Sequence, residues 1–184
     1  MATYEFTEET IEYSGHLLHR IRALRDIGVV RSGTQGGWIE TESNLSQDDD
    51  AWVGGNAVVY GDARVYDEAR VYGSALVFGE ALVFGSAVVY GNARVYHHAW
   101  VFGNARVYGS ALVYGNAQVC GSAVVSDDAR VYGNAWVYGT AWVSDTAWVS
   151  DTARVGGNAR VYGNALVCGS ALVCSNADVW GERT

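Results

Sequence analysis

The amino-acid sequence predicts an all-β protein whose main body is a β-solenoid, a succession of short strands joined by corners. The first observation is a repeat: from Ala51 to Glu182 the chain is twenty-two consecutive six-residue units of the form Ala-x-Val-x-turn-turn. The second is that the last two positions are mostly Gly followed by Asn, Ser, Thr, Asp or Glu, which turn a chain at low cost. The third is that a glycine in most units and a β-branched valine in every unit disfavour a helix.

Residues 1–36 form the first predicted element, a small N-terminal β cap. The stretch "TYEFTEETIEYSGHLLHRIRAL" alternates apolar and polar residues over short runs, which indicates two or three strands. Within it, Ile21 and Ala23 are expected to point inward, opposite to Arg20 and Arg22. His16 and His19 are expected on the polar face of a strand. A cap of this kind protects the strand edges that the end of a solenoid leaves unpaired.

Residues 37–50, "GWIETESNLSQDDD", are predicted to form an irregular first coil. Ile39 and Leu45 stand at six-residue steps back from Ala51, in phase with the repeats. The repeats then run through 51–182, and 183–184 form a tail. At this far end the solenoid is expected to be nearly bare, covered by Trp180 at most, so we expect end-to-end or side-by-side self-association.

Each repeat is predicted to bury two side chains. Alanine and valine two residues apart point to the same side of an extended strand, so every unit contributes one small and one branched side chain to the interior. The predicted core is therefore almost entirely Ala and Val.

Units such as "ALVYGN", "ARVYGN" and "ALVFGS" resemble the hexapeptide repeat of left-handed parallel β-helix proteins, over roughly 70% of the chain. The resemblance implies a single-stranded left-handed parallel β-helix with three units per triangular coil, hence about seven coils stacked about 4.8 Å apart. The segment with "GGWIE" and "NLSQ" resembles the start of uncharacterised hexapeptide-repeat proteins of gut bacteria and their phages. That similarity indicates relatives but no activity.

Composition narrows the function classes. The net charge of -8 and the complete absence of lysine argue against a direct nucleic-acid partner and exclude lysine-dependent catalysis. No apolar run reaches the length of a membrane span, and the N-terminus lacks a basic segment followed by an apolar one, so we expect no membrane partner. The expected location is the cytoplasm of a bacterial host, in a chain that a phage or prophage could encode. We expect no cofactor, no metal and three free thiols.

A pair of histidines raises the question of enzymatic activity. Many left-handed β-helix proteins are acyltransferases that bind acyl-CoA between the prisms of a trimer and use one histidine as general base. His97 and His98 are the only candidates among the repeats, and Glu80 lies one coil from His98. No loop interrupts the repeats to wall a cleft, so the sequence favours an ordinary corner and a protein that is not an enzyme.

The outward positions of every third unit lie on one face of the predicted prism. The residues predicted to bind a partner lie on the most apolar face: Tyr60, Leu76, Phe78, Arg94, Tyr96, Leu112, Tyr114, Arg130, Tyr132 and Trp148, beside Val58 and Leu166. Shorter aromatic rows at Tyr66, Phe84 and Phe102, and at Tyr72, Tyr90 and Tyr108, mark two mixed faces. Rings in neighbouring coils can simply stack and reinforce the fold, with guanidinium groups lying over rings inside units such as Arg94 and Tyr96.

The first functional hypothesis is a structural or protein-binding solenoid that forms a homo-oligomer and engages a protein partner through these rows. A second is a phage-encoded inhibitor whose acidic surface imitates nucleic acid. Residues 1–50 hold ten acids and four Arg, whereas 51–184 hold ten acids and eight Arg, so only the cap could supply such mimicry. The third is the acyltransferase. Glycan binding by the Tyr and Trp rows is a further possibility, but the sequence offers no polar groups at suitable spacing beside them. Ice binding needs flat outward rows of threonine, whereas the threonines of this chain lie at corners.

Overall fold

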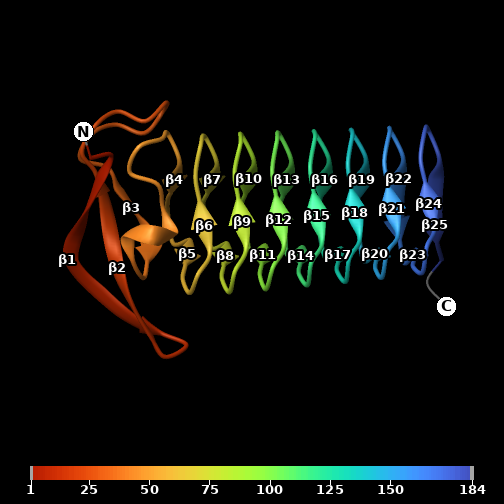
Figure 1. Cartoon of the computed structure of the whole chain (residues 1–184), viewed down its shortest axis with the longest axis horizontal. Helices are drawn as coiled ribbons and strands as arrows, with labels where there is room; N and C mark the ends of the chain where they lie inside the picture. The colour runs from red at the N-terminus through yellow and green to blue at the C-terminus, as the bar shows by residue number, and fades with distance from the viewer. Residues whose placement is uncertain (1, 183–184) are drawn as a thin grey trace.

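The computed structural model describes residues 2–182, which form a long β-solenoid with a β-hairpin at its N-terminal end (Figure 1). Its parallel strands stack in about eight turns, which confirms the predicted all-β solenoid. The described residues contain no α-helix, and the one 3₁₀ turn is η1 (Glu42–Asn44). No helix among residues 2–182 is long and apolar enough to cross a membrane.

Three parallel sheets form the faces of the prism, and each strand pairs with the strand one coil away. The first face is β5 (Val58–Val59), β8 (Leu76–Val77), β11 (Arg94–Val95), β14 (Leu112–Val113), β17 (Arg130–Val131), β20 (Trp148–Val149) and β23 (Leu166–Val167). The second face is β6 (Arg64–Val65), β9 (Leu82–Val83), β12 (Trp100–Val101), β15 (Gln118–Val119), β18 (Trp136–Val137), β21 (Arg154–Val155) and β24 (Leu172–Val173). The third face is β4 (Trp52–Val53), β7 (Arg70–Val71), β10 (Val88–Val89), β13 (Arg106–Val107), β16 (Val124–Val125), β19 (Trp142–Val143), β22 (Arg160–Gly163) and β25 (Asp178–Gly181).

Backbone hydrogen bonds between coils hold the prism together along its axis. In the unit that begins at Ala93, the N–H groups of Arg94, Tyr96 and His98 donate to carbonyls of the next coil at 2.9, 3.0 and 2.9 Å. The pairing partners are eighteen residues apart, as in Val95 with Val113. Residues at the same position of the repeat therefore stack on one another, because eighteen residues are three complete units.

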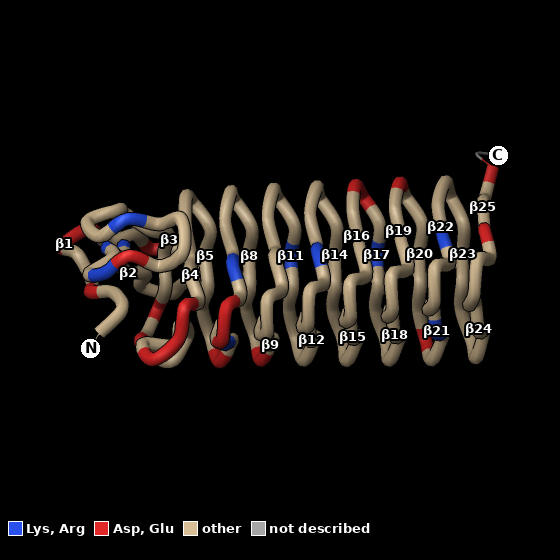
Figure 2. The backbone as a smooth tube through the Cα atoms, turned by 90° about the horizontal axis from the view of Figure 1, so that it is seen from above, with Lys and Arg blue, Asp and Glu red and all other residues tan. Residues whose placement is uncertain are grey.

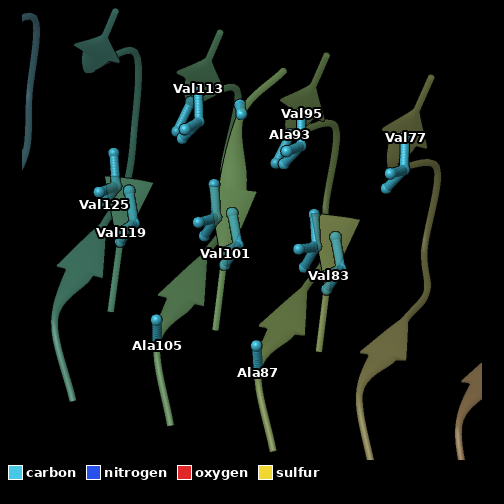
Figure 3. Close-up of a cluster of buried hydrophobic side chains, with 14 of the residues drawn as sticks. Val77, Val83, Ala87, Ala93, Val95, Val101, Ala105, Val113, Val119 and Val125 are labelled. Atoms are coloured by element: carbon cyan, nitrogen blue, oxygen red, sulfur yellow. The ribbon is translucent and has the colours of Figure 1, made fainter. Parts of the chain in front are cut away.

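The interior is built from the alanine and valine of each unit, as predicted. From Ala51 to Val161 these side chains have no exposed surface, and Figure 3 shows valines of several coils projecting from their strands into the interior. The core opens only at the last described coil, where Val173 and Val179 are half-buried. Close packing of so regular a set leaves little room for a larger or charged side chain.

The corners depend on a left-handed backbone at the fifth residue of every unit but the last. Most units place glycine there, as at Gly79 with φ +73°. Asp67 adopts φ +60°, and its Oδ2 accepts the N–H of Gly85 one coil away at 2.9 Å. Aspartate is therefore suited to this corner, because its carboxylate adds a bond between coils and it tolerates positive φ better than most residues.

The N-terminal cap is an antiparallel hairpin of β1 (Tyr4–Tyr13) and β2 (His16–Ala23). The third cap strand, β3 (Gln35–Ile39), pairs with β2 and then runs parallel to β5, so it joins the cap to the first face. The predicted alternation in β2 is confirmed, since Ile21 and Ala23 are buried and Arg22 is exposed.

The irregular first coil differs in register from the expectation. Ile39 and Leu45 are both buried and lie six residues apart, but they stack beneath Val59 and Val65, twenty residues later. Their side chains therefore continue the rows of stacked valines in the core. Counting back from Ala51 in steps of six places them in the rows of stacked alanines instead. The reason is that two extra residues separate this coil from the first repeat.

Candidate binding faces

The first face carries a continuous stack of aromatic rings. Tyr60, Phe78, Tyr96, Tyr114 and Tyr132 follow one another at centroid distances of 5.1, 4.9, 5.0 and 5.0 Å, with interplanar angles of 3, 1, 5 and 4°. The five rings come from consecutive coils, so the structure brings together the residues that the sequence placed in one row. Each ring is at least half-buried by its neighbours, and the loss of solvent raises the pKa of Tyr96 and Tyr114.

Beside the rings runs the second row of the first face. Leu76 and Leu112 are half-buried, whereas Arg94, Arg130 and Trp148 are exposed. Together with the rings they form a surface rich in Tyr, Trp, Arg and Leu. Of these residue types, Tyr, Trp and Arg are enriched in the cores of protein interfaces.

The cap hairpin covers the N-terminal end of this face. Leu18 of β2 is fully buried against Val58 and Tyr60, and Ile11 and Tyr13 pack around the same cluster. In Figure 1 the turn between β1 and β2 lies on the side of the prism that carries β5 and β8. Tyr60 is only 9% exposed, so its assignment to an open docking surface is wrong: a segment of its own chain occupies that position.

Glu40 fastens this hairpin to the solenoid. Its Oε1 lies 2.9 Å from His16 Nδ1, and its Oε2 accepts the N–H of Gly61 at 2.8 Å. The His16 ring lies 4.7 Å from the ring of Tyr60. The ring of His19 lies 4.9 Å from that of Phe6. Both histidines of the hairpin therefore pack against an aromatic ring while staying partly exposed.

Acid should loosen the hairpin through Glu40. The hydrogen bond with His16 and, to a smaller extent, that from the N–H of Gly61 lower the pKa of Glu40 below its ordinary value of about 4.3. A folded-state pKa below the unfolded one means that Glu40 stabilises the hairpin above about pH 4.3, and that this contribution disappears as the pH falls through the lowered value. We expect protease sensitivity of residues 4–23 to rise over this acidic range, and Glu40→Gln to show that raised sensitivity already at neutral pH. Equal sensitivity of wild type and Glu40→Gln at pH 7 would contradict this role.

The arginines of the first face do not lie over the ring of their own unit, contrary to expectation. The guanidinium of Arg130 instead lies 5.0 Å from the ring centre of Trp148, one coil away, and on the second face Arg154 likewise lies 5.7 Å from the ring centre of Trp136. The reason is that rings such as Tyr96 have other rings about 5 Å above and below, which leaves no room between them for a guanidinium.

The other two faces carry shorter stacks of three rings, Tyr66 with Phe84 and Phe102, and Tyr72 with Tyr90 and Tyr108. Both stacks end where a small residue takes the ring position. Trp136 Nε1 lies 3.3 Å from the Cys120 sulfur, and Trp142 Nε1 lies 3.3 Å from Ser126 Oγ. Burial raises the pKa of Cys120, so this thiol has a structural place and little thiolate character. Cys120, Cys168 and Cys174 are all free thiols, as predicted.

The two histidines form the corner between the first and second faces. His97 takes the glycine position at φ +59° and its ring lies 4.8 Å from Tyr96. His98 Nδ1 lies 3.1 Å from Glu80 Oε2, so the predicted proximity of these two residues is confirmed. Both side chains of that pair are more than half exposed, at 57% and 62%. They line a shallow groove of about 560 Å³ that extends onto the second face.

Acidic residues gather at the N-terminal end of the molecule, as Figure 2 shows for the backbone. Several of them are engaged within the fold: Asp50 pairs with Arg25 at 2.8 Å, and Asp49 Oδ2 accepts the N–H of Asp67 at 3.1 Å. Over residues 2–182 no group of three or more His, Cys, Asp or Glu side chains is placed to hold a metal ion.

Comparison with known proteins agrees with this architecture. The family described as YdcK beta solenoid repeat matches residues 63–79, 89–101, 99–115, 129–145, 153–169 and 159–175. No curated protein matches the chain. The sequence match and the fold together make this chain a β-helix repeat protein.

Proposed function

We propose that this chain is a non-enzymatic, protein-binding β-solenoid that associates with a second copy of itself through the exposed part of the first face. The observation that carries the proposal is the stack of rings from Tyr96 to Tyr132, which continues beyond the hairpin together with Leu112 and Trp148. A soluble monomer rarely leaves a contiguous apolar surface of this kind in water.

The cap hairpin indicates what suits this surface. Where the hairpin lies, β-strand side chains such as Leu18 and Ile11 pack on Val58 and Tyr60 and bury them. The same columns of aliphatic and aromatic side chains extend along the prism, so a second sheet laid on them would continue a contact that the chain already makes with itself. A copy of the same face is the most economical source of such a sheet.

One register suits the charges of this face. If two copies pack antiparallel with their two-fold axis between β14 and β17, Arg94 of each copy lies opposite Trp148 of the other, and Arg130 lies opposite Leu112. No two arginines then face each other, and the arginine beside a tryptophan can form a cation–π contact. The arrangement is closed, so it gives a dimer and leaves the second and third faces free for another partner.

The double variant Tyr96→Ser/Tyr114→Ser tests the proposal. We expect the dimer to dissociate at least ten-fold more readily than the wild type in sedimentation equilibrium, because two rings of the interface are lost, one of them beside the two-fold axis. The circular dichroism spectrum should stay that of the solenoid, since both rings lie outside the core.

Tyr90→Ser/Tyr108→Ser is the matched control, because it removes two rings from the stack on the third face. We expect it to lower stability as much as the first variant without altering the mass. A mass change of equal size in both variants would contradict a role specific to the first face, as would no change in either.

The Glu80–His98 pair supports a second candidate, acyl transfer with His98 as general base. The exposed corner supplies no wall for a substrate, so this reading needs the neighbouring prisms of a trimer, and a melting temperature raised by acyl-CoA would favour it. The phage-type inhibitor has less support, because Asp49 and Asp50 of the cap already bond to Asp67 and Arg25.

A further inference from the structure

The groove beside His98 is bounded on one side by a column of polar side chains at the corner. Asp62, Glu80, His98 and Asn116 occupy the sixth position of units in four consecutive coils. Strand spacing sets them about 4.8 Å apart along the axis of the prism. The column thus offers carboxylate, imidazole and amide groups in succession, and Asp62 makes no hydrogen bond or ion pair with any side chain between residues 2 and 182.

The other side of the groove is the edge of the second face. Arg64, Leu82, Trp100 and Gln118 stand on β6, β9, β12 and β15, which pair directly in that order. Trp100 is 40% exposed, and its ring meets Phe84 edge-on at 6.4 Å. Within the described part of the chain, the amide of Gln118 has no hydrogen-bond partner on another side chain. Asp62 and Gln118 are therefore free to bind beside the exposed ring, whereas Glu80 pairs with His98 and the amide N–H of Asn116 donates to Asn134 Oδ1.

The chemistry of the two columns suits a ligand rich in hydroxyl groups. Carboxylates accept hydrogen bonds, the guanidinium donates them, and the amides of Asn116 and Gln118 do both. The indole of Trp100 offers a flat apolar surface to the C–H face of a sugar ring. Two acids and one arginine give the groove a formal charge of -1 with the histidine counted as neutral, which disfavours a phosphate and is too small to select a strongly basic peptide.

The shape of the groove suits a chain and not a single small molecule. The groove is shallow and follows the axis of the prism over four coils, with at least one polar group in each. A pyranose in an extended β-1,4-linked glycan advances by slightly more than the strand spacing of about 4.8 Å, and alternate rings are turned over. Neighbouring sugars therefore lie near neighbouring coils, and one ring at a time can stack on Trp100.

We propose that this groove binds a neutral, extended glycan that lies parallel to the solenoid axis and stacks one sugar ring on Trp100. The polar column at Asp62, Glu80, His98 and Asn116 hydrogen-bonds one edge of the glycan, and Arg64 and Gln118 bond the other. The groove is independent of the first face, so a dimer held by that face keeps two such sites.

Isothermal titration calorimetry with cellohexaose, xylohexaose, mannohexaose and laminarihexaose tests the proposal. We expect at least one of these neutral hexasaccharides to bind the wild-type protein. Trp100→Ala should weaken that binding at least ten-fold, and Asp62→Asn and Gln118→Ala should each weaken it several-fold. The Asp62 and Gln118 variants keep the test valid if Trp100→Ala affects folding.

Trp136→Ala is the matched control. It removes a tryptophan of the same face with nearly the same exposure, 38%, but outside the groove, and should leave binding unchanged. Absence of binding by all four hexasaccharides at millimolar concentration would overturn the proposal. So would binding that survives the three groove variants or that Trp136→Ala abolishes equally.

Discussion

The substitution Val125→Asp is expected to destabilise the solenoid severely. Val125 has no exposed surface and lies between Val107 and Val143 in a core built almost entirely of alanine and valine. The interior offers no cation or donor to a carboxylate, so the variant must bury an unpaired charge or take up a proton. We expect a loss of more than about 4 kcal/mol in the free energy of unfolding, measured by urea denaturation followed by circular dichroism.

Val124→Asp provides the control within the same strand. Val124 is half-buried, points outward from β16 and lies between Arg106 and Trp142, so a carboxylate there reaches solvent and a neighbouring cation. Its expected cost is below about 1 kcal/mol. If the two variants unfold at similar urea concentrations, Val125 does not point into the core and Val124 does not point into solvent.

The substitution Leu18→Ala is expected to release the cap hairpin from the first face while the repeats stay folded. Leu18 is fully buried against Val58 and Tyr60, and truncation of a buried leucine costs about 2–5 kcal/mol. Because two strands alone are marginally stable, this loss should fall on the hairpin and not on the prism. Hydrogen exchange should become faster at the amides of residues 4–23, with the amides of 93–161 unaffected.

Leu17→Ala serves as the comparison, because Leu17 is the preceding residue of the same strand and is 56% exposed. It should change hydrogen exchange in the hairpin only slightly. Unchanged protection of the hairpin in Leu18→Ala would mean that backbone pairing between β2 and β3, and not the apolar contact with the first face, holds the cap in place.

The repeat region could be predicted from the sequence almost completely. Eighteen residues make one coil, so the sequence places Arg94 beside Leu112 and Tyr96 beside Tyr114, as the register confirms. The same arithmetic placed Glu80 beside His98. Regular stacking makes such contacts predictable, because a side chain one coil away is set by the period alone.

The cap could be predicted only in part, because its position does not follow from a period. The alternation in β2 gives strands, yet both the end of the prism and its first face offer apolar surface to them. Which one Leu18 covers is decided by the path of the chain through the irregular first coil, where two extra residues shift Ile39 into a valine column. That is why Tyr60 was expected to be open and is buried.

The groove on the second face shows a different limit. Its sides come from two neighbouring units of each coil, the corner of one and the strand of the next, and sorting residues by face separates them. Sorting by face therefore did not place Asp62, a corner residue, beside Trp100, a strand residue of the second face. In the structure both residues line one groove. Sorting by corner as well as by face would have placed polar groups beside a tryptophan.

The absolute mass of the wild-type protein in solution tests the central proposal most directly. Light scattering on a size-exclusion column at two concentrations should give about twice the single-chain mass of 19.8 kDa, with the Tyr96→Ser/Tyr114→Ser variant shifted toward one chain. A mass of one chain at both concentrations, equal for wild type and variant, would contradict self-association through the first face.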